Sequence, residues 1–136
     1  MTTTDRRATL IVFEGIDGSG KTTLSNAVAA ALRAQGLAVA HVREGGNFAS
    51  AVTQGIREFG RDAKNVALSP HAELFVYLAR EIQLLDEATA PALAANDVVI
   101  ADRFFYTAEL LATAGRGLTP AEVEPVVAAA KRGVEP

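Results

Sequence analysis

The sequence predicts an α/β protein of three layers, in which a parallel sheet lies between two layers of helices. Residues 8–14, 37–42 and 97–102 form three short apolar runs, as strands do when both of their faces are buried. Between these runs apolar residues recur at helical spacing, and this alternation favours parallel strands joined by helical crossovers. A sheet of this class has about five strands, so the three predicted strands are an incomplete set.

The first strand and the first helix have clear boundaries. Ala8–Glu14 reads ATLIVFE and leads into a glycine-rich loop. The helix predicted over Lys21–Gln35 ends before Gly36, a residue that commonly terminates helices. Its apolar residues have helical spacing and are Leu24, Val28, Ala31 and Leu32.

The second strand is predicted over Leu37–Val42. Arg43–Asn47 (REGGN) then forms the loop that leaves this strand. Residues 50–60 are expected to be helical, although Gly55 and Gly60 both weaken a helix.

The central helix has a strong start signal. Ser69 offers a hydroxyl cap and Pro70 occupies the first helical position. The helix is expected to run to about Thr89, with Pro91 bending or restarting it. The apolar run Asp97–Asp102 is the third predicted strand, and it ends on an acidic residue.

The C-terminal part is predicted to be helical. Residues 104–113 form one expected helix, and the capping box Thr119–Glu122 (TPAE) opens a last helix that Gly133 ends. No further strand is predicted after it. We therefore expect residues 1–136 to be a single domain and the N-terminal portion of a longer protein. A short form completed by a partner is the alternative.

The composition excludes several classes of protein. With 136 residues, 49% hydrophobic and 21% charged, the chain is typical of a globular domain. The absence of cysteine excludes disulfides and thiolate metal sites and agrees with a cytoplasmic location. The first apolar run is too short for a secretion signal or a membrane span, and a net charge of −3 argues against general nucleic-acid binding. We expect neither nucleic acid nor a membrane as a partner.

The segment Gly15–Thr22 reads GIDGSGKT and matches the phosphate-binding pattern G-x-x-x-x-G-K-[ST] at every fixed position. Its glycines let several backbone N–H groups point at one phosphate chain, and the positive end of the following helix adds to the attraction. Lys21 can reach the β- and γ-phosphates, and the Thr22 hydroxyl can bind Mg²⁺. The pattern predicts a nucleoside triphosphate site; a glycine-rich turn without a ligand is the alternative.

Polar residues follow each predicted strand, at the edge where parallel sheets bind ligands. The glycine loop, Arg43 and the pair Asp102–Arg103 all lie there. A planar guanidinium pairs with phosphate through two hydrogen bonds, so both arginines are candidates for binding a second phosphate. A surface ion pair is the alternative for each arginine. Asp102 is either close to the metal and the transferred group or only a helix cap.

Four segments carry a resemblance to a known family. They are Phe13–Thr23 (FEGIDGSGKTT), Arg43–Gly46 (REGG), Asp102–Phe104 (DRF) and Gly115–Leu118 (GRGL). Through them the chain resembles the thymidylate kinases, which are P-loop nucleoside monophosphate kinases, over essentially its whole length. The resemblance implies a P-loop NTPase fold. Family members continue with two more strands, a lid and adenine-contacting residues, and their second motif carries a proline between Glu and Gly that this chain lacks.

The resemblance also implies a role for each matching residue. The ATP phosphates would be held by Gly15, Ile16, Asp17, Gly18, Ser19, Gly20, Lys21, Thr22 and Thr23. Thr22 and Asp102 would lie toward Mg²⁺. Arg43 and Arg103 would hold the acceptor's 5′-phosphate, and Asp17 would reach the acceptor's sugar or phosphate. The residues expected to act in catalysis are Lys21, Asp17, Asp102 and Arg103.

The chain departs from the family where the base is recognised. The family stacks an aromatic residue on the thymine and reads the base with an arginine four positions later. Here the aromatic residue is Tyr77, but Glu81 stands at the arginine's position and Arg80 precedes it. Both positions neighbour residue 77 on a helix, so Arg80 is the candidate substitute. An ionised Glu81 cannot donate to a thymine carbonyl. Leu111–Thr113 (LAT) replaces a Tyr-Gln-Gly segment of the family.

The remaining candidates have simpler interpretations. Phe104 is a candidate wall of the acceptor pocket, with core packing as the alternative. Glu14 follows the first strand and is interpreted as a feature of the loop rather than as a base. A sparse basic segment, interpreted as a solvated face, contains Arg57, Arg61 and Lys64.

The resemblance therefore implies an enzyme, a phosphotransferase that uses ATP and Mg²⁺ to convert dTMP to dTDP. Catalysis would depend on positioning and on neutralising phosphate charge, without a protein nucleophile. A kinase for another small acceptor and an NTP-binding regulatory module without transfer are the alternatives. A homodimer is compatible with this reading.

Overall fold

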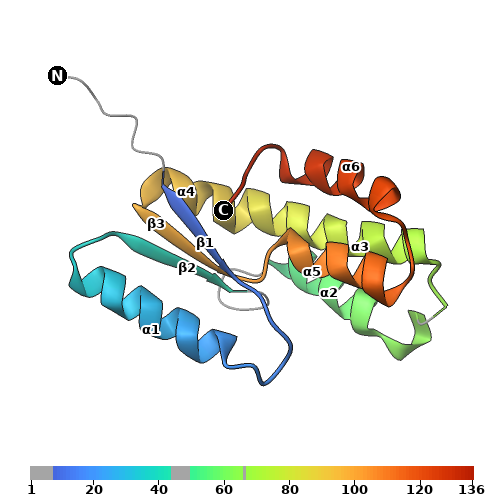
Figure 1. The fold of residues 1–136 in the computed structure, drawn as a ribbon, viewed down its shortest axis with the longest axis horizontal. Coiled ribbons are helices and arrows are strands. Elements are labelled where there is room, and N and C mark those ends of the chain that lie inside the picture. The colour runs from blue at the N-terminus through green and yellow to red at the C-terminus, as the bar shows by residue number, and fades with distance from the viewer. Residues whose placement is uncertain (1–7, 44–49, 66) are drawn as a thin grey trace.

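The computed structural model describes residues 8–43, 50–65 and 67–136 and has a three-stranded parallel sheet with helices on both sides (Figure 1). The strands are β1 (Thr9–Phe13), β2 (Val39–Arg43) and β3 (Val98–Asp102), in the order β1-β3-β2. The three predicted strands and the α/β class are confirmed. Their boundaries move by one or two residues at most.

The register of the strands gathers three chain segments at one edge of the sheet. Phe13 of β1 and Arg43 of β2 each have Asp102 of β3 as their Cα partner. The carboxyl ends of all three strands therefore lie side by side, and the segments that leave β1 and β3 begin next to one another.

The described residues contain six α-helices and three shorter helical turns. The α-helices are α1 (Lys21–Ala34), α2 (Ala51–Arg61), α3 (Pro70–Leu84), α4 (Ala90–Ala95), α5 (Phe105–Leu110) and α6 (Pro120–Lys131). A 3₁₀ turn spans Ala63–Asn65, and π-helical turns span Leu85–Thr89 and Leu111–Gly115. Every predicted helix is confirmed in its position along the chain. Among the helices described, none has the length and apolar character needed to cross a bilayer.

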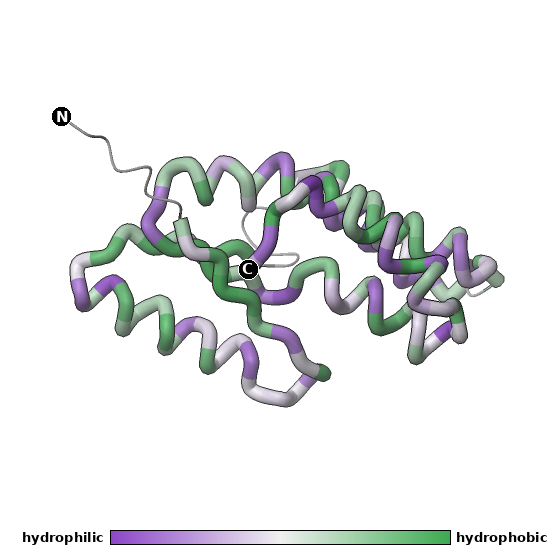
Figure 2. Tube along the Cα trace, turned by 45° about the horizontal axis from the view of Figure 1, so that its top comes forward, coloured by the Kyte–Doolittle hydropathy of each residue, from purple (hydrophilic) through white to green (hydrophobic). Residues whose placement is uncertain are grey.

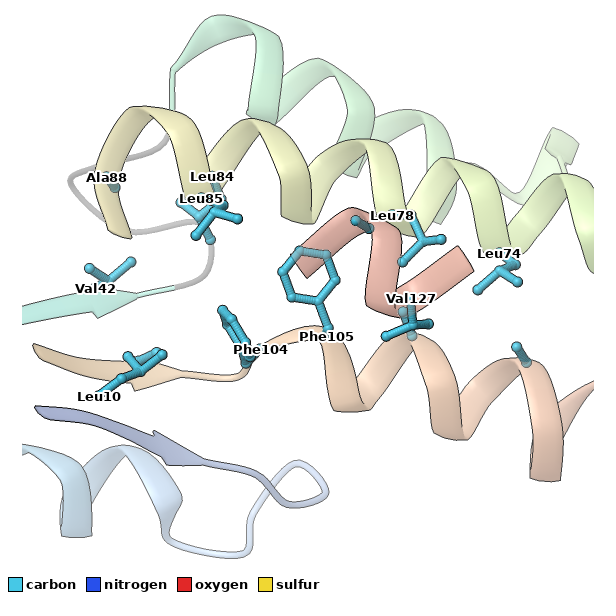
Figure 3. Close-up of a cluster of buried hydrophobic side chains, with 14 of the residues drawn as sticks. Leu10, Val42, Leu74, Leu78, Leu84, Leu85, Ala88, Phe104, Phe105 and Val127 are labelled. Atoms are coloured by element: carbon cyan, nitrogen blue, oxygen red, sulfur yellow. The ribbon is translucent and has the colours of Figure 1, made fainter. Parts of the chain in front are cut away.

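Side chains of β3 alternate between two apolar clusters, one on each face of the sheet. Val98 and Ile100 pack with Ala29 of α1, whereas Val99 and Ala101 belong to a larger cluster on the opposite face. Figure 3 shows part of this larger cluster, with Leu78 of α3, Phe105 of α5 and Val127 of α6. Figure 2 shows that the strands are hydrophobic along most of their length. Burial on both faces explains why the strands lack polar alternation.

The central helix is interrupted before its proline. α3 ends at Leu84 rather than near Thr89, and the N–H of Ala90 donates to the carbonyl of Leu85 across a wider turn. Pro91 lies in the first turn of α4. Proline has no N–H to donate and its ring crowds the preceding turn, so the backbone widens before it. The helix does restart at Pro91, but regular α-helical geometry ends earlier than predicted.

Two predicted helix caps are confirmed. The Ser69 hydroxyl accepts a hydrogen bond from the backbone N–H of Ala72 at 3.3 Å, at the start of α3. At the start of α6, the backbone N–H of Thr119 donates to Glu122 Oε2 at 2.8 Å, completing the capping box. This bond to the ionised carboxylate is the largest cause of a lowered pKa at Glu122.

Candidate active site

The loop between β1 and α1 curls so tightly that it requires glycine. A Cβ atom added to Gly15 would lie 2.7 Å from the Ser19 hydroxyl oxygen, closer than real Cβ contacts allow. Gly18 and Gly20 have φ angles of 80° and 88°, in the left-handed region that glycine adopts at little cost. The loop can therefore turn its backbone inward and enter α1 directly.

This loop and the first turn of α1 line a cavity of about 320 Å³, which we call the loop cavity. Its lining consists of Ile16, Gly18, Ser19, Gly20, Lys21, Thr22 and Thr23. Seven of the nine residues predicted to hold the ATP phosphates thus surround one space. Backbone N–H groups at a helix N-terminus attract anions, so the cavity is suited to a phosphate chain.

A cation, a hydroxyl and a carboxylate meet beside the loop cavity. Thr22 Oγ1 donates a hydrogen bond of 3.0 Å to Asp102 Oδ2, and Lys21 Nζ lies 4.0 Å from Asp102 Oδ1. Asp102 is 8% exposed. Its carboxylate therefore interacts with α1, across the edge of the sheet, and Phe104 is the N-cap residue of α5. The interpretation of Asp102 as only a helix cap is wrong.

The oxygen atoms of Thr22 and Asp102 are of the kind that Mg²⁺ prefers. Mg²⁺ is bound in phosphate-transfer sites through one or two protein oxygens together with water and phosphate oxygens, rather than by an all-protein cage. Among the described residues no group of three or more His, Cys, Asp or Glu side chains is placed to hold a metal. The donor set fits a metal ion that is shared with a triphosphate.

A second space, of about 440 Å³, adjoins the loop cavity and is here called the side-chain cleft. It is lined by Glu14, Gly15, Ile16, Asp17, Arg61, Tyr77, Arg80, Arg103, Tyr106, Thr107, Leu110 and Leu111. Ile16 belongs to both linings. The cleft combines arginines and acids with exposed apolar side chains such as Leu110, which is 64% exposed. Such a mixture suits a ligand with an anionic part and a flat apolar part.

Arg103 projects into the side-chain cleft from a strained backbone position. Its φ angle is 75°, which is uncommon for a residue other than glycine. Arg103 Nη2 lies 3.3 Å from Asp17 Oδ1, and Nη1 donates to Thr107 Oγ1 at 3.1 Å. Two predicted catalytic residues, Asp17 and Arg103, are thus brought together although they are far apart in the sequence.

Tyr77 and Arg80 both line the side-chain cleft, as the sequence predicts for base recognition. The Arg80 guanidinium lies 5.2 Å from the centre of the Tyr77 ring. Its Nε and Nη2 atoms both donate to Glu81 Oε1, at 3.1 and 2.6 Å. Arg80 and Glu81 are each 4% exposed, so this is a buried ion pair on adjacent residues of one helix.

Other predicted acceptor residues are placed differently. Phe104 is 3% exposed and packs edge-to-face on Phe105 in the core, so it follows the core-packing alternative and does not line the cleft (Figure 3). Arg43 ends β2, but its side chain lies outside the described residues, and so does the loop that follows it. Its predicted contact with phosphate stays a prediction. Leu111, in the segment that by the resemblance replaces Tyr-Gln-Gly, lines the cleft.

Several residues that line the cleft were not predicted as site residues from the sequence, among them the polar residues Arg61, Glu14 and Thr107. Arg61, interpreted as part of a solvated face, lines the cleft from the end of α2. Glu14 accepts a hydrogen bond from the backbone N–H of Phe104 at 2.9 Å and another from the hydroxyl of Thr107 at 2.7 Å. The available signal was the position of Glu14, an acid directly after a buried strand and before the phosphate loop. Arg61 and Thr107 carry no comparable local signal.

The comparisons with known proteins agree with this geometry. The family model described as thymidylate kinase matches residues 13–126. A thymidylate kinase of Solidesulfovibrio magneticus is 39% identical over 127 residues, and one of Geotalea uraniireducens is 39% identical over 126; each alignment covers 93% of this chain. The alignments cover 59% and 58% of those relatives, so the chain spans less than two thirds of their length.

A solved structure is also similar. The thymidylate kinase from Ehrlichia chaffeensis superimposes with a TM-score of 0.77 at 27% identity, covering 96% of this chain and 71% of that one. The sequence match spans the phosphate loop, the side-chain cleft and most of α6. By sequence and by fold, the chain belongs to the thymidylate kinase family.

Proposed function

We propose that this protein transfers the γ-phosphoryl group of ATP to dTMP and so produces dTDP. The observation that carries the proposal is the adjacency of the loop cavity and the side-chain cleft, with Ile16 in both linings. A phosphate chain in the first space and an anionic ligand in the second would face each other at this edge of the sheet. Membership of the thymidylate kinase family supports the same pair of ligands.

On the donor side, the chain supplies a cradle and charge. The curled loop from Gly15 to Gly20 and the N-terminus of α1 would bind the triphosphate through backbone N–H groups. Lys21 would neutralise charge on the transferred group. Thr22 and Asp102 would hold Mg²⁺, which supplies charge stabilisation for the phosphates when bound.

On the acceptor side, Arg103 would hold the phosphate of dTMP, as a guanidinium matches phosphate through two parallel hydrogen bonds. Asp17 lies beside Arg103 and is fully exposed, in position to meet the sugar or phosphate of the acceptor. Tyr77 offers an aromatic face for the base. Arg43 completes the set of phosphate ligands in this proposal.

In the transfer step, an oxygen of the acceptor phosphate forms a bond to the γ-phosphorus, and the bond between this phosphorus and the β–γ bridging oxygen breaks. ADP leaves with the electron pair of that bond, and no protein nucleophile is needed. Lys21 and Arg103 contribute by orienting the two phosphates and by offsetting their mutual repulsion.

The direct test is the formation of dTDP from ATP, Mg²⁺ and dTMP by the purified chain, followed by ³¹P NMR. We expect turnover that requires all three components. Binding of ATP with no dTDP formed would favour the NTP-binding regulatory module instead.

A second candidate function is favoured by the buried pair of Arg80 and Glu81. Glu81 offsets part of the positive charge of Arg80. A contact between Arg80 and the base of the acceptor would therefore differ from the contact made by an arginine that has no acidic neighbour. A kinase for another small phosphorylated acceptor is therefore the second candidate. A screen of dTMP, dUMP, dCMP, dGMP and dAMP at equal concentrations decides between the two functions. The highest kcat/KM for dTMP supports the first function, and the highest kcat/KM for another acceptor supports the second.

A further inference from the structure

Glu14 joins the phosphate loop to the segment that follows β3. It lies directly after β1, where the loop begins, and its two carboxylate oxygens bind different partners. Oε1 accepts from the backbone N–H of Phe104 at 2.9 Å, and Oε2 accepts from Thr107 Oγ1 at 2.7 Å. A single carboxylate thus anchors both the entry to α5 and its first turn.

The hydroxyl of Thr107 continues this connection to Arg103. Arg103 Nη1 donates to Thr107 Oγ1 at 3.1 Å, and the same nitrogen lies 3.8 Å from Glu14 Oε2. A guanidinium can only donate and an ionised carboxylate can only accept. The single hydroxyl proton of Thr107 therefore points to Glu14, while the hydroxyl oxygen accepts from Arg103. Only this set of hydrogen-bond directions satisfies Glu14, Thr107 and Arg103 together.

The backbone at Arg103 is held on both sides of its strained residue. The N–H of Arg103 donates to the carbonyl of Phe13 at 2.9 Å, and the next N–H, that of Phe104, donates to Glu14. A positive φ of 75° is strained at a residue other than glycine and persists only when its surroundings enforce it. Glu14 is one of the groups that hold the backbone in this conformation.

We propose that Glu14 is a positioning residue, which acts through Thr107 and the backbone of Phe104 to hold the Arg103 guanidinium in the side-chain cleft, ready for the acceptor phosphate. The proposal rests on the proposed function, in which Arg103 binds that phosphate. Arg103 is 19% exposed and Glu14 is 29% exposed, so both face the cleft while remaining accessible to a ligand. Without Glu14 the guanidinium keeps its charge and its contact with Asp17, but it loses the carboxylate that fixes Thr107 and the backbone of Phe104 beside it.

The ligand-free test measures the side chain of Arg103 by NMR, in a protein of 14.2 kDa. Rotation about the Cζ–Nε bond of Arg103 is slowed when its Nη atoms are held, and the variant R103K identifies the signals. In Glu14→Gln we expect this rotation to accelerate about 10-fold, as the weakening of a hydrogen bond to a charged group implies. Unchanged rotation would overturn the proposal, whether or not the chain binds dTMP.

The functional test compares acceptor binding by calorimetry, with dTMP and with thymidine, which lacks the phosphate. Glu14→Gln should weaken dTMP binding about 10-fold and change thymidine binding by less than about 2-fold. Thr107→Val should act in the same direction, and Thr107→Ser, which keeps the hydroxyl, should stay within about 2-fold of the wild type. Equal losses for dTMP and thymidine would mean that Glu14 only supports the fold.

A double-variant comparison isolates the dependence on Arg103. In an Arg103→Met background, Glu14→Gln should change dTMP binding by less than about 2-fold, because the residue that it positions is gone. A full additional loss in that background would overturn the proposal. If wild-type protein binds no dTMP, the proposed function fails, and the NMR experiment alone decides the role of Glu14.

Discussion

The loop cavity and the side-chain cleft lie at the same edge of the sheet, but different parts of the chain form them. The loop cavity is lined by residues within 16–23, and its shape comes from the backbone and from the absence of Cβ atoms. The side-chain cleft is lined by residues from positions 14 to 111, and its charge comes from arginine and acidic side chains. A site formed by the backbone depends on its glycines and on the few charged side chains beside it, whereas a site formed by side chains can alter its ligand through one or two substitutions.

The buried ion pair illustrates this difference. By the resemblance drawn from the sequence, Glu81 stands at a position where the family has arginine. Tyr77 and Arg80 both line the cleft, and Arg80 donates to Glu81. Nothing comparable has changed in the loop cavity, where the phosphate-binding pattern is complete. The departures that concern base recognition therefore lie in the cleft, and the following predictions compare the cleft with the loop cavity.

The largest effect is expected at Lys21, the charged side chain of the loop cavity. Lys21→Met should lower kcat/KM for dTDP formation by about 10³-fold, because the charge that offsets the transferred phosphoryl group is removed. The matched control is Lys64→Met, in an exposed turn after α2, which should keep its activity. Retained activity in Lys21→Met would show that the loop cavity does not hold the reacting phosphate.

Breaking the buried ion pair of the cleft should cost stability as well as acceptor binding. Arg80→Met removes the buried guanidinium that donates to Glu81 Oε1, so the free energy of unfolding should fall by about 3 kcal/mol in urea titrations. The double variant Arg80→Met/Glu81→Leu should recover most of this loss. The control Arg132→Met breaks a half-exposed pair with Asp86 and should cost less than about 1 kcal/mol. Equal losses in the single and double variants would contradict the ion-pair explanation.

The backbone character of the loop cavity is tested by adding one methyl group. Gly15→Ala would place a Cβ 2.7 Å from the Ser19 hydroxyl and should weaken ATP binding about 10-fold, measured by calorimetry. Gly36→Ala is the control, since Gly36 has a φ of 84° but no atom within 4 Å of the added Cβ. It should lower stability and leave ATP binding unchanged. If both variants bind ATP like the wild type, the short distance between Gly15 and the Ser19 hydroxyl does not contribute to ATP binding.

The difference between the loop cavity and the side-chain cleft also explains which features could be predicted from the sequence. The strands, the phosphate loop and the caps at Ser69 and Thr119 depend on neighbouring residues, so their patterns are visible in short windows. The contacts of Glu14 with Phe104 and Thr107 span about 90 positions and depend on the register of β1 against β3. Arg61 reaches the cleft only because α2 packs on α3. Such contacts leave no local pattern.

The smallest expected effect concerns a locally encoded contact outside both spaces, the capping box of α6. The pKa of Glu122 lies below its ordinary value of 4.5. The largest cause is the hydrogen bond from the backbone N–H of Thr119, followed by the bond from the Thr119 hydroxyl, and the charge of His71 lowers the pKa further. A carboxyl group with a lowered pKa stabilises the folded state above its unfolded pKa, and this contribution is lost as the pH falls through the folded pKa. Wild-type protein should therefore exceed Glu122→Gln in thermal stability near neutral pH and lose that advantage in acid.

The control for this prediction is Glu124→Gln, which removes the same charge from an exposed position of the same helix. Glutamine can still cap the helix through its side-chain oxygen, so any difference between Glu122→Gln and the wild type reports the ionised carboxylate rather than the loss of the cap. If Glu122→Gln and Glu124→Gln show the same dependence of stability on pH, the capping bonds do not select the charged form. A local pattern would then predict the contact but not its electrostatic consequence.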